Sequence, residues 1–386
     1  MMENSAGIYI HIPFCVKKCN YCAFLSFASD AEVIEKYIES LHREIEECKA
    51  NLISVDSVYF GGGTPSLLTS EKLGQILNAL REKFPLNSDL EITLEANPGT
   101  LGKTNAEILK KLCEYRNLGI NRLSFGVQSM NNEALNFLGR IHNAEDARNN
   151  FVLARKAGFD NINVDLMLSV PFVDNPMEYE IADAEELIKL KPEHISCYSL
   201  QIEEDTPFGK MYAEGILHEI SDELDRKIYH KICEILKTHG YEQYEISNFA
   251  KSGFKSRHNS KYWNMTDYLG LGLGASSFVN GVRYKNTGDM REYLRGKHIA
   301  EKYKNTMHDN ISEAVFTGLR RNTGIKYNEI FTDSTNAYET FWNYYATARQ
   351  EVVSFVKTGH LIVDFDGIRL TETGIDISNK IMSLFV

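Results

Sequence analysis

Short β-branched runs alternate with longer amphipathic stretches across the first 240 residues. The runs typical of strands cover 8–12, 57–60, 91–95, 122–126, 161–170 and 194–202. Apolar residues recur at helical spacing over 32–48, 71–84, 106–115, 144–157, 177–190 and 224–239. This alternation indicates βαβ units, whose strands form a parallel sheet. Six such units predict an α/β fold with a full or partial (β/α) barrel, while the periodicity leaves an open doubly wound sheet as an alternative.

The pattern changes beyond about residue 290. Helical spacing covers 313–320 and 346–358, and two strand runs, 361–365 and 368–370, flank an Asp366-Gly367 turn that predicts a hairpin. A last helix is expected over 374–384. Helices followed by a hairpin resemble a winged-helix module. We therefore expect a barrel domain over 1–290 and a small α+β domain over 291–386, with a connector at 303–310.

Charge and composition narrow the classes of protein. Lys and Arg number 42 against 53 Asp and Glu, which gives a formal net charge of -11. An acidic chain is poorly suited to general nucleic-acid binding, because phosphate contacts need a basic surface. No apolar stretch is long enough to span a bilayer, the first residues lack a secretory signal, and the seven cysteines do not indicate a disulfide framework. We expect a reduced, cytoplasmic protein.

Three cysteines follow the first predicted strand in a C-x3-C-x2-C arrangement: Cys15, Cys19 and Cys22. Thiolates are soft ligands that suit iron–sulfur clusters or zinc. Three sulfurs within eight residues can hold three irons of a [4Fe-4S] cluster and leave the fourth iron without a protein ligand. A structural zinc site needs four ligands, and no fourth partner lies at zinc-finger spacing. Zinc and three unrelated core cysteines remain the alternatives.

Glycines and polar residues also lie at or near the ends of the next predicted strands. Three glycines, Gly61 to Gly63, follow the second strand, Glu95 and Gln128 end the third and fourth, and Asp165 lies in the fifth. Carboxylates inside apolar strands are costly unless they are paired or bind a ligand. Barrel enzymes build their sites at the carboxyl ends of the strands. These positions therefore predict a ligand-binding site at the carboxyl ends of the strands. The alternative is that the polar groups pair with one another.

The cysteine spacing, the Gly61-Gly62-Gly63-Thr64-Pro65 segment and the Tyr9-Ile10-His11-Ile12-Pro13-Phe14 run before Cys15 resemble the radical SAM superfamily, in its coproporphyrinogen III oxidase-like branch. The resemblance implies a partial (β/α)6 radical SAM barrel with a [4Fe-4S] cluster on the three cysteines and S-adenosylmethionine (SAM) on the open iron. Within it, Arg140 would pair with the SAM carboxylate and Asp165 with ribose hydroxyls. The implied SAM contacts are Tyr9, Tyr21, Gly62, Gly63, Thr64, Glu95, Gln128, Arg140, Asp165 and Ser199.

Two kinds of relative share this branch. Oxygen-independent coproporphyrinogen III dehydrogenases decarboxylate two propionates, whereas HemW-type proteins bind heme and are thought to deliver it to hemoproteins. The dehydrogenases carry a further cysteine where Phe24 stands here, and they have a longer extension before the position of Cys15. The run His258-Asn259-Ser260-Lys261-Tyr262-Trp263 resembles the H-N-x-x-Y-W motif of the heme-binding branch. The resemblance therefore implies a heme chaperone with hemoprotein clients.

The same motif suggests where heme would bind. The neutral imidazole of His258 can ligate heme iron, Tyr262 and Trp263 can pack on the macrocycle, and Arg257 can pair with a propionate. The alternative is that the motif anchors the loop after the barrel. Two enzyme hypotheses also stay open: an oxidoreductase of the coproporphyrinogen III dehydrogenase type, and a radical SAM enzyme acting on another tetrapyrrole. Turnover by either would need a reductant such as flavodoxin or ferredoxin.

Overall fold

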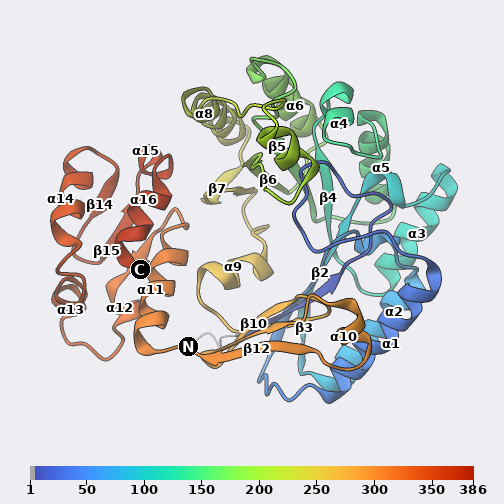
Figure 1. The fold of residues 1–386 in the computed structure, drawn as a ribbon, viewed down its shortest axis with the longest axis horizontal. Helices are drawn as coiled ribbons and strands as arrows, with labels where there is room; N and C mark the ends of the chain where they lie inside the picture. Colours follow the sequence, from blue (N-terminus) through green and yellow to red (C-terminus); the bar gives the residue numbers. More distant parts are fainter. Residues whose placement is uncertain (1–4) are drawn as a thin grey trace.

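The computed structural model describes residues 5–386; residues 1–4, part of the segment without a predicted secretory signal, lie outside it. Figure 1 shows a large α/β body and a smaller unit made of the last part of the chain. Two main hydrophobic cores correspond to these parts. The larger involves residues from Ala6 to Tyr293, and the second residues from Ile311 to Phe385.

A sheet of twelve strands forms the large body, in the order β12-β11-β10-β9-β1-β2-β3-β4-β5-β6-β8-β7. The six central strands are parallel and follow chain order. They are β1 (Ala6–Ile12), β2 (Val55–Gly62), β3 (Leu86–Ala96), β4 (Arg122–Gln128), β5 (Ile162–Leu168) and β6 (His194–Ser199). The predicted βαβ units are thus confirmed, with strands that extend one to five residues beyond several predicted bounds.

The longer helices cover the outer face of these strands (Figure 1). They are α1 (Ala31–Glu47), α2 (Ser70–Lys83), α3 (Asn105–Asn117), α5 (Ala144–Lys156), α6 (Met177–Lys189) and α8 (Asp222–Thr238); α4 (Asn132–Phe137) and α7 (Pro207–Ala213) are shorter helices between them in the chain. At the start of every one of these helices except α6, a side chain accepts from a free backbone N–H group. Asp30 accepts from Val33 N at the start of α1, and Thr104 with Glu107 forms a capping box on α3.

The six central strands form a partial barrel, because the first and the last of them, β1 and β6, pair with other strands and not with each other. β1 pairs with β9 (Tyr268–Leu271) in parallel, and β6 pairs with β8 (Asn248–Ala250) in antiparallel fashion. The remaining elements around them were not predicted: β7 (Glu242–Glu245), α9 (Arg257–Trp263), β10 (Ser276–Val279), β11 (Val282–Asn286), α10 (Met290–Leu294) and β12 (Ile299–Lys304). Strands of four to six residues carry too few residues to show a clear period.

The C-terminal module packs its helices on a three-stranded sheet, β13-β15-β14. Its elements are α11 (Met307–Gly318), β13 (Ile325–Lys326), α12 (Tyr327–Ile330), α13 (Ala337–Tyr344), α14 (Arg349–Lys357), β14 (Leu361–Val363), β15 (Gly367–Leu370), α15 (Glu372–Ile375) and α16 (Ser378–Met382). The predicted α+β character and the 361–370 hairpin are confirmed, with Leu361 opposite Leu370.

Two predictions about this end of the chain were wrong. The single helix expected over 374–384 is instead two short helices and a 3-10 turn, because the backbone leaves helical geometry at Ile377 (φ -118°, ψ 24°). The connector expected over 303–310 is largely structured, since β12 runs to Lys304 and Thr306 caps α11. The domain boundary at 290/291 stays a prediction, although β12 belongs to the large sheet.

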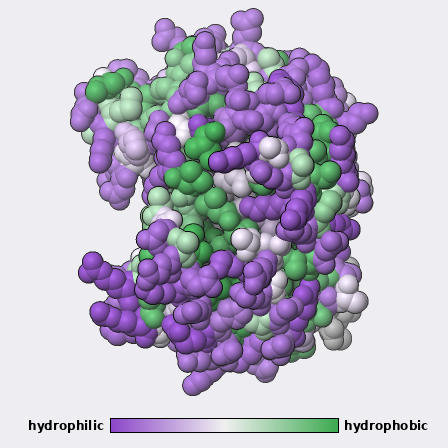
Figure 2. All heavy atoms as spheres, turned by 90° about the vertical axis from the view of Figure 1, so that its right-hand side faces the viewer, coloured by the Kyte–Doolittle hydropathy of each residue, from purple (hydrophilic) through white to green (hydrophobic). Residues whose placement is uncertain are grey.

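Figure 2 views the molecule from the right-hand side of Figure 1. Hydrophilic atoms cover most of this face, and hydrophobic atoms gather in a band near its middle. Among the described residues, no helix combines the length and the hydropathy needed to cross a bilayer.

Candidate functional site

The three clustered cysteines lie in the loop between β1 and α1, which folds back over the carboxyl end of the sheet. Backbone hydrogen bonds hold its two arms together: Cys15 N donates to Phe27 O at 3.1 Å, and Phe27 N donates to Pro13 O at 2.9 Å. All three thiols, Cys15, Cys19 and Cys22, are free and line one cavity of about 140 Å³. The spacing seen in the sequence therefore corresponds to a real grouping of soft ligands.

The glycine segment after β2 forms the neighbouring wall of this cavity. Gly62 has a φ of +112°, and a Cβ there would lie 2.5 Å from Cε1 of His11. A Cβ on Gly63 would lie 2.7 Å from the carbonyl oxygen of Phe14. Glycine is required here because the segment presses against β1 and the start of the cysteine loop. The backbone N–H of Gly62 also donates to Oε2 of Glu95 at 3.1 Å, which links two predicted site residues.

Two carboxylates, one near the end of β3 and one in the middle of β5, project into the same cavity. Glu95 accepts from the hydroxyl of Tyr59 at 2.8 Å, and Asp165 accepts from Nδ2 of Asn163 at 2.7 Å. Burial raises the pKa of Glu95 to about 7 and also raises the pKa of Asp165. Within residues 5–386 neither forms an ion pair. A ligand that brings a cation, such as an ammonium group, would supply the missing charge.

Arg140 supplies the opposite charge in the same cavity. One of its terminal nitrogens lies 3.4 Å from Sγ of Cys19 and 3.5 Å from the hydroxyl of Tyr21, and the other donates to the carbonyl of Gly126. Its Nε has no hydrogen-bond partner among the described residues, and no carboxylate pairs with the guanidinium there. A cavity with a cationic group on one side and two acids on another suits a zwitterion such as the aminocarboxylate end of SAM.

Most of the predicted SAM contacts are brought together. The small cavity is lined by Tyr21, Gly62, Gly63, Thr64, Glu95, Gln128, Arg140 and Asp165, together with the three cysteines. Gln128 takes a positive φ of 73° where β4 ends and accepts from the hydroxyl of Tyr198 at 3.0 Å. The close grouping matches the placement expected at the carboxyl ends of parallel strands.

Tyr9 and Ser199 are the two that do not line this cavity. The Tyr9 hydroxyl is hydrogen-bonded to Nδ1 of His11 at 3.0 Å, deeper in the barrel. Ser199 accepts from a terminal nitrogen of Arg226 at 3.3 Å and lines a second, larger cavity. The roles of Tyr9 and Ser199 as SAM contacts stay predictions.

The predicted heme motif lies on α9, and none of its residues lines either cavity. His258 is buried, its Nδ1 is 3.2 Å from the hydroxyl of Ser57, and its Nε2 is 2.9 Å from the hydroxyl of Tyr262. Burial lowers the pKa of His258 to about 3, so the imidazole is neutral at pH 7. The Trp263 ring stacks under the guanidinium of Arg320 at 4.6 Å. In this conformation the contacts of the motif side chains join α9 to β2 and to the C-terminal module.

Arg257, which the sequence placed near a heme propionate, is exposed. It forms an ion pair with Asp89 at 2.9 Å on the amino-terminal side of the motif helix. It therefore lines neither the small cavity nor the larger one. Heme contact by this group of residues stays a prediction.

The larger cavity was not predicted from the sequence. It measures about 1050 Å³, lies between the barrel and the C-terminal module, and adjoins the small cavity at Tyr21, Cys22, Phe24 and Tyr198. Phe24, singled out only as a replacement for cysteine, is 70% exposed at this junction. No local signal could reveal the cavity, because one side comes from residues between 21 and 247 and the other from residues 320 and 375–379.

Comparisons with known proteins agree with this geometry. Residues 9–184 match the Radical SAM superfamily. The solved structure of coproporphyrinogen III oxidase (HemN) from Escherichia coli, a radical SAM enzyme, is similar to the chain with a TM-score of 0.83 at 25% identity, over 99% of this chain and 90% of that one. The fold is that of a radical SAM protein.

Sequence relatives identify the branch. The heme chaperone HemW of Lactococcus lactis is 33% identical over 390 residues, which span 100% of this chain and 98% of that protein. HemW of Escherichia coli is 37% identical over 301 residues, 76% of each chain. The chain belongs to the HemW family, as the motifs predicted.

Proposed function

We propose that this protein is a heme chaperone that carries a [4Fe-4S] cluster and SAM and passes heme to hemoprotein clients. The observation that carries the proposal is full-length similarity to HemW proteins combined with Phe24 at the position where the dehydrogenases have a cysteine. Phe24 places an exposed aromatic ring, in place of a thiol, between the cluster site and the large cavity. An exposed ring suits contact with a flat apolar macrocycle.

In this proposal each group in the small cavity has one task. Cys15, Cys19 and Cys22 ligate the cluster, Arg140 binds the SAM carboxylate, and Glu95 with the glycine segment holds its amino group. Asp165 accepts from ribose hydroxyls, and Gln128, Tyr21 and Thr64 complete the enclosure. When bound, a reduced cluster of this class supplies the electron for reductive SAM cleavage. The raised pKa of Glu95 supports a role as partner of a cation, whose arrival would restore the ionised form.

Heme binding by the α9 motif is a separate part of the proposal. Ligation by His258 would first have to break its hydrogen bonds to Ser57 and Tyr262. Cytoplasmic location, hemoprotein clients and a reductant such as flavodoxin or ferredoxin also belong to the proposal. The clients and the reductant follow from the resemblance, and the location follows from the composition and the cysteine count.

Two parallel assays test the central proposal. Anaerobically reconstituted protein is titrated with heme and followed by its Soret band, and a second sample receives coproporphyrinogen III, SAM and reductant. We expect a saturable Soret shift and no decarboxylated product by mass spectrometry. A vinyl product without saturable heme binding would refute the chaperone function and indicate a dehydrogenase. The Phe24→Ala variant is expected to weaken heme binding while keeping the cluster.

A further inference from the structure

The large cavity has one wall from the barrel and one from the C-terminal module. The barrel contributes β6, α8 and the Phe24 loop, and the module contributes residues 375–379. Its volume of about 1050 Å³ is at the upper end of the range for small-molecule and cofactor sites. Apolar and aromatic groups such as Phe24, Tyr198, Ile246 and Ile375 alternate with charged ones along its surface. The cavity thus has room for a cofactor-sized ligand beside the cluster site.

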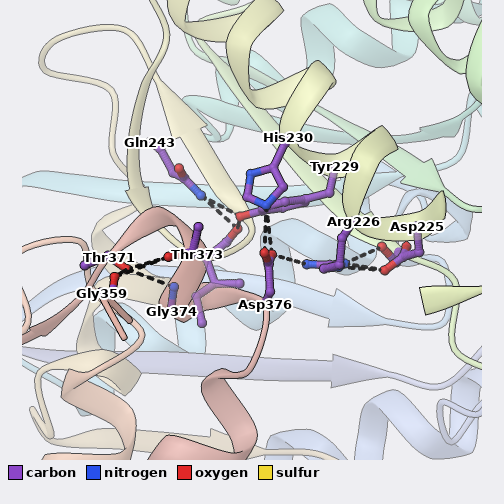
Figure 3. Close-up of polar contacts among 12 residues, drawn as sticks. Asp225, Arg226, Tyr229, His230, Gln243, Gly359, Thr371, Thr373, Gly374 and Asp376 are labelled. Carbon is purple, nitrogen blue, oxygen red and sulfur yellow. Dashed lines mark hydrogen bonds and ion pairs between the residues drawn. The ribbon is translucent and has the colours of Figure 1, made fainter. Parts of the chain in front are cut away.

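A carboxylate of the C-terminal module contacts two nitrogen-bearing side chains of α8, as Figure 3 shows. Both oxygens of Asp376 accept from Nε2 of His230 at 2.9 Å, and one lies 3.6 Å from a terminal nitrogen of Arg226. Arg226 also pairs with its neighbour Asp225 and donates to Ser199 inside the cavity. Asp376 follows the end of α15, at the break that separates it from α16. Its carboxylate is therefore presented by an irregular segment.

We propose that Arg226 and His230 form a binding subsite for a carboxylate of the bound tetrapyrrole, and that Asp376 occupies this subsite until the ligand replaces it. The inference rests on the proposed function, because heme is the ligand that would bring the carboxylate. Arg226 reaches both the subsite and the cavity interior, since it contacts Ser199. A propionate on a macrocycle in the cavity can therefore meet the same guanidinium that now faces Asp376.

The surrounding charges favour replacement of the Asp376 carboxylate by the ligand carboxylate over binding of both carboxylates at once. Asp222, Glu223 and Asp225 line the same side of the cavity, so the region already carries excess negative charge. A ligand carboxylate added beside both Asp225 and Asp376 would put three anions around one guanidinium, which is unfavourable. Replacement of Asp376 keeps the number of carboxylates constant. The intramolecular carboxylate thus acts as a competitor whose removal raises ligand affinity.

Replacement of Asp376 would also break one contact between α8 of the barrel and the C-terminal module. The module would keep its second contact with α8, the ion pair of Lys237 with Glu372, which lies outside the cavity lining. Glu372 therefore provides a matched control: its loss weakens the same α8–α15 contact without touching the subsite.

The test compares heme with its dimethyl ester, which lacks carboxylates, by difference spectroscopy on the full-length reconstituted protein. Asp376→Asn, which keeps an oxygen for His230, should tighten heme binding about three- to tenfold. Arg226→Gln should weaken it at least tenfold. Neither variant should change the affinity for the ester by more than about twofold, and Glu372→Gln should leave the ratio of heme to ester affinity unchanged.

The outcomes separate this inference from the proposed function. If the wild-type protein shows no saturable heme binding, the chaperone function fails. If it binds heme but Asp376→Asn leaves the affinity unchanged or lowers it, the exchange is refuted and the chaperone function stands. Equal effects on heme and ester, or an equal gain in Glu372→Gln, would show that loosening of the module and not carboxylate exchange is responsible, and would also refute it.

Discussion

Glu95 is expected to make the barrel less stable as the pH rises from 5 to 8. Its carboxylate lies at the end of β3, hydrogen-bonded by Tyr59 and by the backbone of Gly62 and without a cationic partner in the described chain. Burial raises its pKa from 4.5 to about 7 in the folded protein. The folded state therefore holds a proton over a range in which the unfolded chain has lost it. The resulting stabilisation is complete below about pH 4.5 and is lost as the pH rises through about 7.

The size of the effect follows from the two pKa values. One pKa unit corresponds to about 1.4 kcal/mol, so the full shift would change the free energy of unfolding by about 2.5 kcal/mol between pH 5 and 8. The carboxylate is partly exposed to the cavity, and solvent there screens it. We therefore expect a change of about 1–2 kcal/mol.

Urea unfolding at pH 5, 6, 7 and 8 measures this change. The chain has two tryptophans, Trp263 on the barrel side and Trp342 in the C-terminal core, so a Trp342→Phe background lets Trp263 report on the barrel. Glu95→Gln removes the titration and keeps the side-chain shape. The parent should lose about 1–2 kcal/mol relative to this variant from pH 5 to pH 8, without SAM. Parallel pH profiles of parent and variant would refute the reasoning.

Further substitutions test the rest of the site. Cys19→Ala should abolish [4Fe-4S] assembly, measured as bound iron and visible absorption after reconstitution, whereas Cys48→Ala should retain it; equal iron in both variants would contradict the assignment. Gly62→Ala should lower stability by about 2–4 kcal/mol, because its Cβ would lie 2.5 Å from the neighbouring histidine ring at a positive φ, and an unchanged melting temperature would count against that reading. Tyr262→Phe should cost about 1 kcal/mol, because its hydrogen bond to His258 is lost, and should shift the Soret maximum of the heme complex, since the proposal includes heme binding by this motif. An unchanged Soret maximum in that variant would count against heme contact by the motif.

The chemistry of the small cavity could be predicted because it follows from local rules. Parallel strands in chain order bring their carboxyl ends to one edge, so Glu95, Gln128 and Asp165 had to meet near the cysteine loop once the βαβ units were recognised. The separation of three cysteines along the chain already limits them to one loop. The glycine segment could be singled out from the sequence, whereas the contacts with His11 and Phe14 that require Gly62 and Gly63 come from the structure.

Other features depended on contacts between distant parts of the chain. Periodicity cannot reveal whether a sheet closes, and only the pairing of β1 with β9 and of β6 with β8 makes the barrel partial. His258 has the chemistry of a ligand, but its two hydrogen bonds depend on where α9 packs. The last helix appeared continuous because its apolar spacing continues through Ile377, where the backbone breaks.

The sequence by itself determined the βαβ order, the grouping of the three cysteines with most of the residues that we propose for SAM binding, and the family, because each is encoded in short spacing or in regular alternation. Only the tertiary structure decided the large cavity and the contact of Asp376 with Arg226 and His230. These depend on how the C-terminal module packs against α8, some 150 residues earlier. Side-chain contacts over such distances leave no periodic trace in the sequence, since they are set by the packing of whole elements.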